Sequence, residues 1–99
     1  MMLNITGNKM DITDPIRTLI EKKFKRIEKH FTHGVTKADV VLTVENLNHI
    51  AKANVHANGV EINAHGEAEN MYKAIDIMLD KLNRQVIKLK EKITAHHNE

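Results

Sequence analysis

The chain has 99 residues, which allows one domain with a single hydrophobic core but not a second domain. Its 41% hydrophobic and 28% charged residues are typical of a folded globular protein, and its formal net charge is only +2. It has no cysteine, which excludes disulfide bonds and thiolate chemistry, and it shows neither a signal-peptide pattern nor the run of about 18 apolar residues that a membrane span needs. We therefore expect a cytoplasmic protein without membrane contacts.

The first predicted elements are a strand and a helix. Residues 3–7 alternate apolar and polar side chains, which predicts a strand with one buried face. Asp14 is a favourable N-cap and Pro15 suits the first helical position, so a helix is predicted to begin there. Apolar residues then recur at spacings of three and four until His33 and Gly34, as in an amphipathic helix. They are Ile16, Leu19, Ile20, Phe24, Ile27 and Phe31.

Three further strands are predicted from alternating residues. The second covers residues 38–44, the third covers 51–57, and Val60, Ile62 and Ala64 form the inward face of the fourth. The third and fourth strands are separated by Asn-Gly, the strongest short-range signal for a two-residue hairpin turn. One face of the resulting sheet is therefore predicted to be buried and the other to be polar.

A long second helix is predicted from about Glu69, where the apolar period returns to 3.6 residues. Its buried stripe consists of Met71, Ile75, Met78, Leu79, Leu82, Val86, Leu89 and Ile93. Residues 95–99 are expected to fray. The order β-α-β-β-β-α predicts an α+β fold in which residues 1–94 form one domain. A four-stranded sheet with one polar face must hold both amphipathic helices on its other face.

Charged residues are distributed unevenly along this chain. Residues 15–33 hold six basic side chains against two acidic ones, and residues 81–92 hold five against one. Residues 34–70, which include the predicted hairpins, hold two basic side chains against five acidic ones. Both helices are therefore partly basic while the sheet is acidic, an asymmetry typical of proteins that bind phosphates.

Helical phase places most of these basic residues on the outward sides of the helices. On the first helix they are Lys22, Lys25, Arg26 and Lys29. On the second helix they are Lys81, Arg84, Lys88 and Lys92. Such rows can be no more than solvated faces, but like charges repel one another and a polyanion removes that repulsion. We interpret the two rows as an RNA-binding surface.

Aromatic residues are too few for a surface that stacks single-stranded bases. Phe24 and Phe31 belong to the buried stripe, which leaves Tyr72 as the one candidate for stacking. We therefore expect contacts with the backbone and shape of RNA, made by the basic residues together with neutral donors such as Gln85 and Asn83.

No catalytic, metal or cofactor site is expected. The chain lacks a nucleophile elbow, a phosphate-binding glycine loop and an H-E-x-x-H motif. His56 and His65 are predicted to lie on the polar face of the sheet, not opposite one another and without a carboxylate to orient them. His96 and His97 do not form a complete set of metal ligands.

Four segments occur together in an order that is specific even though each is short. They are Leu3–Asn8, Ile12–Thr13, Asn70–Asp76 and Asp80–Gln85. With the chain length and the element order, they resemble the bacterial ribosome hibernation promoting factors. The pattern departs at Asn70, where the family usually has an acidic residue, but asparagine can also begin a helix.

This resemblance implies both a fold and a target. The family fold is likened to double-stranded RNA-binding domains. Its members bind the small ribosomal subunit in stationary phase, in the channel between head and platform, where they obstruct messenger RNA and transfer RNA. They contact ribosomal RNA largely through basic residues of the two helices. The matching residues here are Lys22, Lys25, Arg26, Lys29, Lys81, Arg84 and Lys88.

Three forms of the family differ at their C-termini, and this chain resembles the short one. That form acts with a separate ribosome modulation factor to pair ribosomes into inactive dimers, and we expect the free protein to be monomeric. Two alternatives stay open. A general double-stranded RNA-binding module or RNA chaperone would use the same basic residues, and a nuclease would use His56 or His65.

Overall fold

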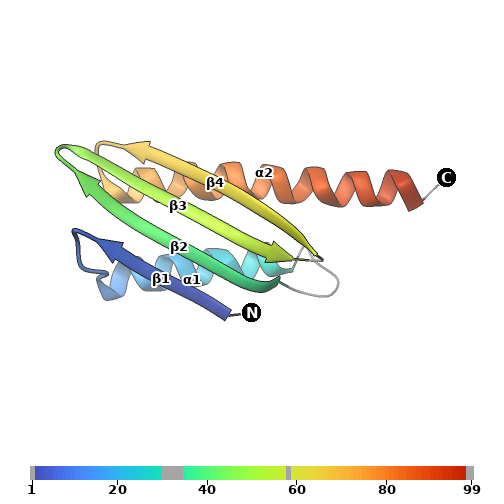
Figure 1. Cartoon of the computed structure of the whole chain (residues 1–99), viewed down its shortest axis with the longest axis horizontal. Helices are drawn as coiled ribbons and strands as arrows, with labels where there is room; N and C mark the ends of the chain where they lie inside the picture. Colours follow the sequence, from blue (N-terminus) through green and yellow to red (C-terminus); the bar gives the residue numbers. More distant parts are fainter. Residues whose placement is uncertain (1, 30–34, 58, 98–99) are drawn as a thin grey trace.

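The computed structural model describes residues 2–29, 35–57 and 59–97, with the side chains of all of these except 35 and 90–97. Its elements follow the predicted order (Figure 1). They are β1 (Met2–Asn8), α1 (Asp14–Glu28), β2 (Val35–Glu45), β3 (Asn48–Ala57), β4 (Val60–Ala68) and α2 (Met71–His97). Helix α2 thus reaches into the predicted tail 95–99, whose fraying stays a prediction, as does the 1–94 domain boundary.

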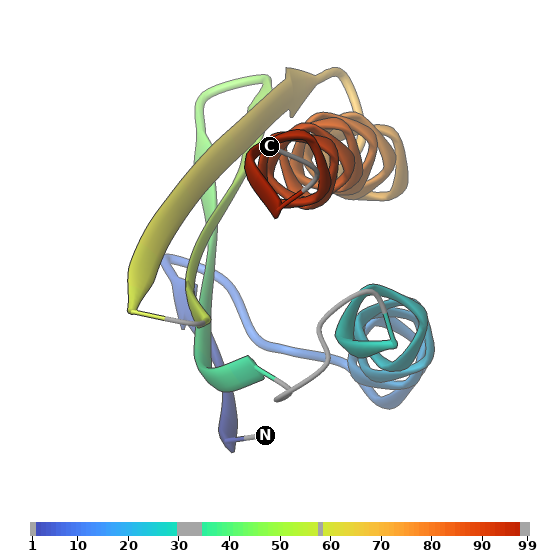
Figure 2. The same cartoon turned by 90° about the vertical axis from the view of Figure 1, so that its right-hand side faces the viewer.

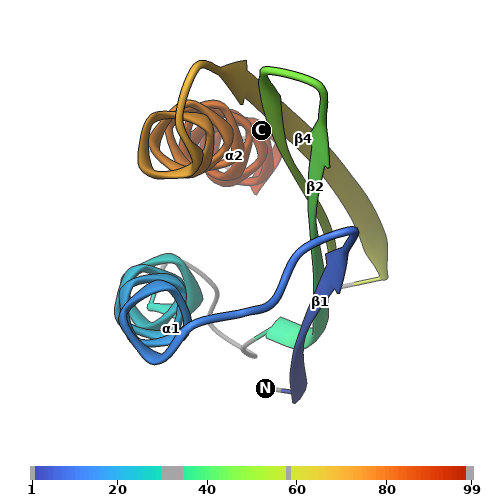
Figure 3. The ribbon, with the colours of Figure 1, turned by 90° about the vertical axis from the view of Figure 1, so that its left-hand side faces the viewer.

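The four strands form one sheet in the order β1-β2-β3-β4. Strand β1 pairs with β2 in parallel, and the other neighbouring strands are antiparallel. Both helices lie on the same face of this sheet, as Figures 2 and 3 show. The predicted α+β fold, with two helices on one face of a four-stranded sheet, is confirmed.

The hydrophobic core lies between the sheet and the helices. From α1 it contains Ile16, Ile20, Phe24 and Ile27, and from α2 it contains Met71, Ala74, Ile75, Met78, Leu79, Leu82 and Val86. The sheet contributes alternate residues of β2, β3 and β4, as expected for strands with one covered face. Leu19 and Leu89 are partly buried at the margin of this core, and the side chains of Phe31 and Ile93 lie outside the described ones.

The predicted hairpin between β3 and β4 is confirmed. Ala57 pairs with Val60 across a two-residue turn, and Gly59 has the positive φ (74°) that this turn requires. One detail is wrong, because Val60 is 40% exposed and not part of the core. Alternation assigns a side chain to a face, but Val60 is the first residue of an edge strand, next to the turn, where fewer neighbours can cover it.

The predicted ends of the first helix are also corrected. Its N-cap is Thr13, not Asp14: the Thr13 hydroxyl accepts from the Ile16 N–H (3.4 Å) and its carbonyl accepts from the Arg17 N–H (3.0 Å). Proline is tolerated throughout a first turn, so it did not distinguish the two caps. The helix ends at Glu28 and not near residue 33, because apolar spacing shows which residues share a face and not where hydrogen bonding ends.

Helix α2 is held closely against the edge strand β4. Asn70 caps the helix, as its side chain accepts from the Lys73 N–H (2.9 Å). Gly66 of β4 faces the helix, and a Cβ atom there would lie 2.6 Å from the Met78 nitrogen and even closer to the Ala74 carbonyl oxygen. Glycine therefore sets how near α2 lies to the sheet. Neither α1 nor α2, as far as the described residues go, is apolar enough to cross a membrane.

Candidate nucleic-acid interface

The two helices run in the same direction along the sheet (Figure 1). This follows from the topology, because β1 and β4 are both parallel to β2 and therefore end at the same end of the sheet, where each is followed by a helix. The C-terminal half of α1 and the middle of α2 consequently lie toward the opposite end. Two basic segments far apart in the sequence thus come to the same half of the molecule.

All predicted RNA-binding residues whose side chains are described are exposed to solvent. We define the α1 flank as Lys22, Lys25, Arg26 and Lys29, and the α2 flank as Lys81, Arg84 and Lys88. The side chain of Lys92 lies outside the described ones. Lys29 forms the C-cap of α1, so its positive charge also lies at the negative end of that helix dipole.

Arg84, a member of the α2 flank, forms an ion pair within its own helix. Its guanidinium lies 3.2 Å from the carboxylate of Asp80, one helical turn earlier. The two side chains are 76% and 60% exposed, so the pair is weak in water. A phosphate group can therefore compete for Arg84 at little cost to the fold.

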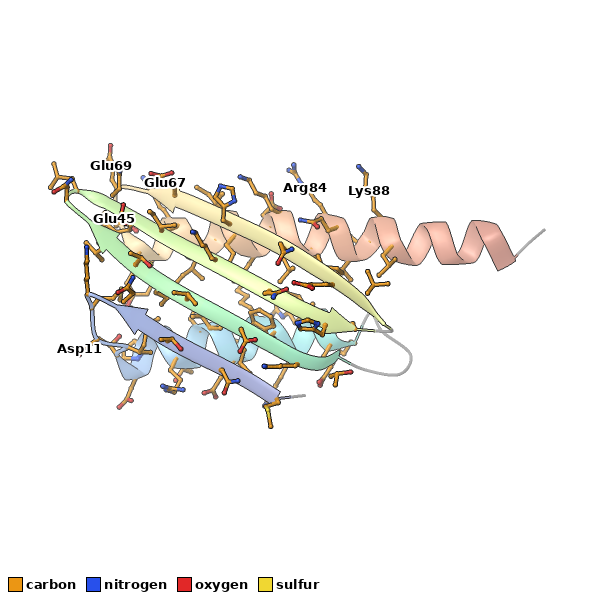
Figure 4. The ribbon with its side chains drawn as sticks, viewed as in Figure 1. Asp11, Glu45, Glu67, Glu69, Arg84 and Lys88 are labelled. Carbon is orange, nitrogen blue, oxygen red and sulfur yellow. The ribbon has the colours of Figure 1, made fainter. Side chains whose placement is uncertain are left out.

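The flanks do not merge into one continuous patch. Figure 4 shows Arg84 and Lys88 projecting from α2 on the side away from α1. Between the helices lies a groove, which separates the α1 flank from the α2 flank. It is lined by Lys23, Arg26, Ile27, Asp76, Leu79, Asp80 and Asn83. Arg26 is thus the member of the α1 flank that faces the other helix.

Gln85 has a structural role that the sequence did not reveal. Its side-chain nitrogen donates to the backbone oxygen of Asn63 in β4, over 2.6 Å. The side chain is still exposed, so its remaining N–H and its oxygen are available to RNA. Its neighbour Arg84 is also exposed, and its guanidinium lies beside Asp80 of the same helix.

Acidic residues gather at the end of the molecule where both helices begin. Figure 4 shows Asp11, Glu45, Glu67 and Glu69 together there, whereas Lys88 lies toward the other end. The molecule is about 50 Å long, several times the Debye length of about 8 Å at physiological salt. The charges at the two ends are therefore screened from one another, and the basic flanks can attract a polyanion although the net charge is small.

His56 and His65 lie on the uncovered face of the sheet, on neighbouring strands. His56 lies opposite Glu61 and His65 lies opposite Lys52, so the two histidines are not paired, as predicted. The expectation that neither has a neighbouring carboxylate is wrong for His56, because Glu61 lies opposite it on the next strand. Of the described residues, no three histidines, aspartates or glutamates are grouped so that they could hold a metal ion. Asp39 instead accepts a hydrogen bond from Asn4 and forms an ion pair with Lys37.

Sequence reasoning missed the groove itself. Lys23, which is not among the predicted RNA-binding residues, is half-buried on the α1 wall of this groove. Asp76 and Asp80 line the α2 wall, and neither is among the predicted site residues. Helical phase places Asp76 and Asp80 on one side of the buried stripe of α2. It does not show whether this side faces α1, because that depends on tertiary packing.

The chain matches known proteins over nearly its whole length. Residues 3–94 match the model of the family described as Sigma 54 modulation protein / S30EA ribosomal protein. A ribosome hibernation promoting factor of Azotobacter vinelandii is 46% identical over 93% of this chain and 85% of the relative. The factor of the same name from Escherichia coli K12 is 44% identical over 97% of this chain and 100% of the relative.

Solved structures agree with these sequence matches. A ribosomal subunit interface protein from Coxiella burnetii superposes with a TM-score of 0.82 at 33% identity, covering 92% of this chain and 99% of the other. The N-terminal domain of Protein Y from Thermus thermophilus superposes with a TM-score of 0.81 at 30% identity, covering 90% and 99%. The resemblance to the ribosome hibernation promoting factors is therefore confirmed, and the chain belongs to the Sigma 54 modulation protein / S30EA ribosomal protein family.

Proposed function

We propose that this protein binds the small ribosomal subunit in the decoding channel and blocks the sites of messenger RNA and transfer RNA. The α1 and α2 flanks hold phosphates of ribosomal RNA, and the uncovered sheet face points away from them. Binding is reversible and involves no bond chemistry. The protein therefore stores ribosomes in an inactive form during stationary phase and releases them when translation resumes.

The observation that carries this proposal is the convergence of two basic flanks on one half of the molecule. Seven exposed cations lie on the C-terminal half and C-cap of α1 and on the middle of α2. Figure 4 shows four carboxylates at the end of the molecule where both helices begin. The names of the relatives, which are hibernation promoting factors and a subunit interface protein, point to a ribosomal target for such a surface. Phosphate contacts fix the position and orientation of a protein without reading the base sequence. This mode of contact suits a protein that binds one fixed site on a large, folded RNA.

We further propose that the protein acts in the cytoplasm as a monomer and promotes inactive ribosome dimers together with a separate modulation factor. A sucrose-gradient profile of stationary-phase ribosomes, from cells with and without the protein, tests this step. Dimers should be lost when the protein is absent. An increase of dimers in its absence would instead identify a protein that inhibits dimer formation.

A general double-stranded RNA-binding module is the second candidate, because the same flanks would also hold a short duplex. A competition experiment separates the two functions. The protein is first bound to small subunits, and an excess of a short RNA duplex is then added. We expect the protein to stay on the subunits. Its release at duplex concentrations comparable to those of the subunits would favour the general module.

A further inference from the structure

The groove between the helices has two walls of opposite charge. Lys23 and Arg26 line the wall formed by α1, and Asp76 and Asp80 line the wall formed by α2. Its apolar surface comes from Ile27 and Leu79, which are otherwise buried. A groove that binds only phosphates has no use for carboxylates, because they repel the phosphates that the neighbouring flanks attract.

Asp76 is exposed on the α2 wall of the groove. It lies beyond the first turn of α2, which holds no acidic residue, so it gains little from the helix dipole. Asp80 follows it at i+4, and such a like-charge pair destabilises a helix. Asp80 is compensated by Arg84, whereas Asp76 has no hydrogen bond or ion pair among the described residues.

We propose that this groove binds one unstacked guanine base of RNA, whose Watson–Crick edge donates hydrogen bonds to the carboxylate of Asp76. The inference rests on the proposed function, since it takes the α1 and α2 flanks to hold the phosphates on either side. The base lies against Ile27 and Leu79, and Lys23 and Arg26 neutralise the phosphate of the same nucleotide. The groove thereby adds recognition of one base to a surface that otherwise contacts only the phosphate backbone of the RNA.

Guanine fits this site better than the other three bases. A carboxylate accepts hydrogen bonds and donates none, so it selects a base edge that presents donors. Guanine offers two adjacent donors, the N1–H and the exocyclic amino group, and can therefore bind both carboxylate oxygens. Adenine, cytosine and uracil each place an acceptor beside their donor on this edge, and that acceptor would face a carboxylate oxygen. Single-stranded bases that leave the stack are commonly read on this edge.

Matched pentaribonucleotides test the proposal, because their phosphates are the same and only the central base differs. The dissociation constants of UUGUU, UUAUU, UUCUU and UUUUU are measured with the full chain at one salt concentration. One bidentate contact corresponds to about 1–3 kcal/mol, so UUGUU should bind about fivefold tighter or more. In Asp76→Asn the side chain presents an amide donor to the guanine donors, and the preference for UUGUU should be lost.

Asp11→Asn serves as the control, since Asp11 does not line the groove and its loss should keep the preference for guanine. Equal affinity for the four oligonucleotides, or a guanine preference that survives in Asp76→Asn, would overturn the inference. Sedimentation with small subunits distinguishes this failure from failure of the proposed function. If the wild-type chain sediments with ribosomes but shows no guanine preference, the groove assignment alone is wrong. If it prefers guanine but does not sediment with ribosomes, the ribosomal function is wrong and the groove assignment stands.

Discussion

Gln85 of α2 donates a hydrogen bond from its side-chain amide to the backbone oxygen of Asn63 in β4, over 2.6 Å. The contact joins the helix of the α2 flank to the edge strand of the sheet. It also occupies a backbone acceptor of that edge, which would otherwise be open to another strand. One residue at this position thus links the predicted interface to the stability of the fold.

Gln85 and Arg84 are neighbours with different predicted effects. Gln85→Ala should lower the free energy of unfolding by about 1 kcal/mol, because a hydrogen bond to the backbone is lost. Arg84→Ala should change it by less, because its ion pair is exposed, but should weaken RNA binding more. Urea unfolding and the dissociation constant of ribosomal RNA are measured for both variants. Equal changes in both quantities would contradict this division of roles.

Gly66 is predicted to be intolerant of substitution. Gly66→Ala places a methyl group against the backbone of α2 near Met78, so the helix must move away from the sheet. Overpacking of this kind costs about 1–3 kcal/mol. Gly59→Ala is a useful comparison, because its positive φ is strained but nothing lies within 4 Å of the added atom. A structure of Gly66→Ala should show α2 displaced, and unchanged helix position and stability would refute the close approach described here.

The fold was largely predictable because apolar residues recur with the helical period in the helices and alternate in the strands, and both patterns show which face of an element is buried. Ile20, Phe24 and Leu82, all of which belong to predicted stripes, are fully buried. The predictions that failed concern positions where a local pattern does not determine the outcome. Thr13 and Asp14 are both favourable N-cap residues, so the sequence does not decide between them. Val60 follows the alternation of the core residues of its strand, but too few side chains surround it to bury it.

The exposure of the candidate RNA-binding residues was predictable residue by residue, but their arrangement was not. Helical phase identified the exposed cations correctly, such as Lys25 and Lys88. It could not show that the α2 flank points away from α1, or that Asp76 faces a groove opposite Arg26, because the relative rotation of two helices is set by their packing on the sheet. Gln85 was assigned to RNA alone because its partner Asn63 is distant in sequence.

The corrected cap of α1 gives a direct test. Thr13→Ala removes the side-chain acceptor of the Ile16 N–H and should lower the free energy of unfolding by about 1 kcal/mol. Asp14→Ala removes only a favourable charge from the first turn and should cost about 0.3–1 kcal/mol, an effect that salt reduces. Thermal unfolding at low and high salt separates the two contributions. A larger, salt-independent loss for Asp14→Ala would restore Asp14 as the cap.

Binding to ribosomal RNA should weaken steeply as salt is added, because each phosphate contact releases counterions. Replacing one contacting residue, as in Lys25→Ala, should reduce the slope of the logarithm of affinity against the logarithm of salt by about 0.7–0.9. Lys52→Ala, on the uncovered face of the sheet, should leave the slope unchanged. Equal slopes for all three proteins would remove Lys25 from the interface.

Co-sedimentation of charge-reversed variants with small ribosomal subunits tests the central claim most directly. One variant carries Lys81→Glu, Arg84→Glu and Lys88→Glu on the α2 flank. The matched control carries Lys9→Glu, Lys37→Glu and Lys52→Glu, which reverse as many exposed charges away from both helices. With circular dichroism showing both proteins folded, we expect the α2 variant to leave the subunit fraction and the control to remain there. Retention of the α2 variant at moderate salt, or loss of both proteins alike, would contradict binding through the helix flanks.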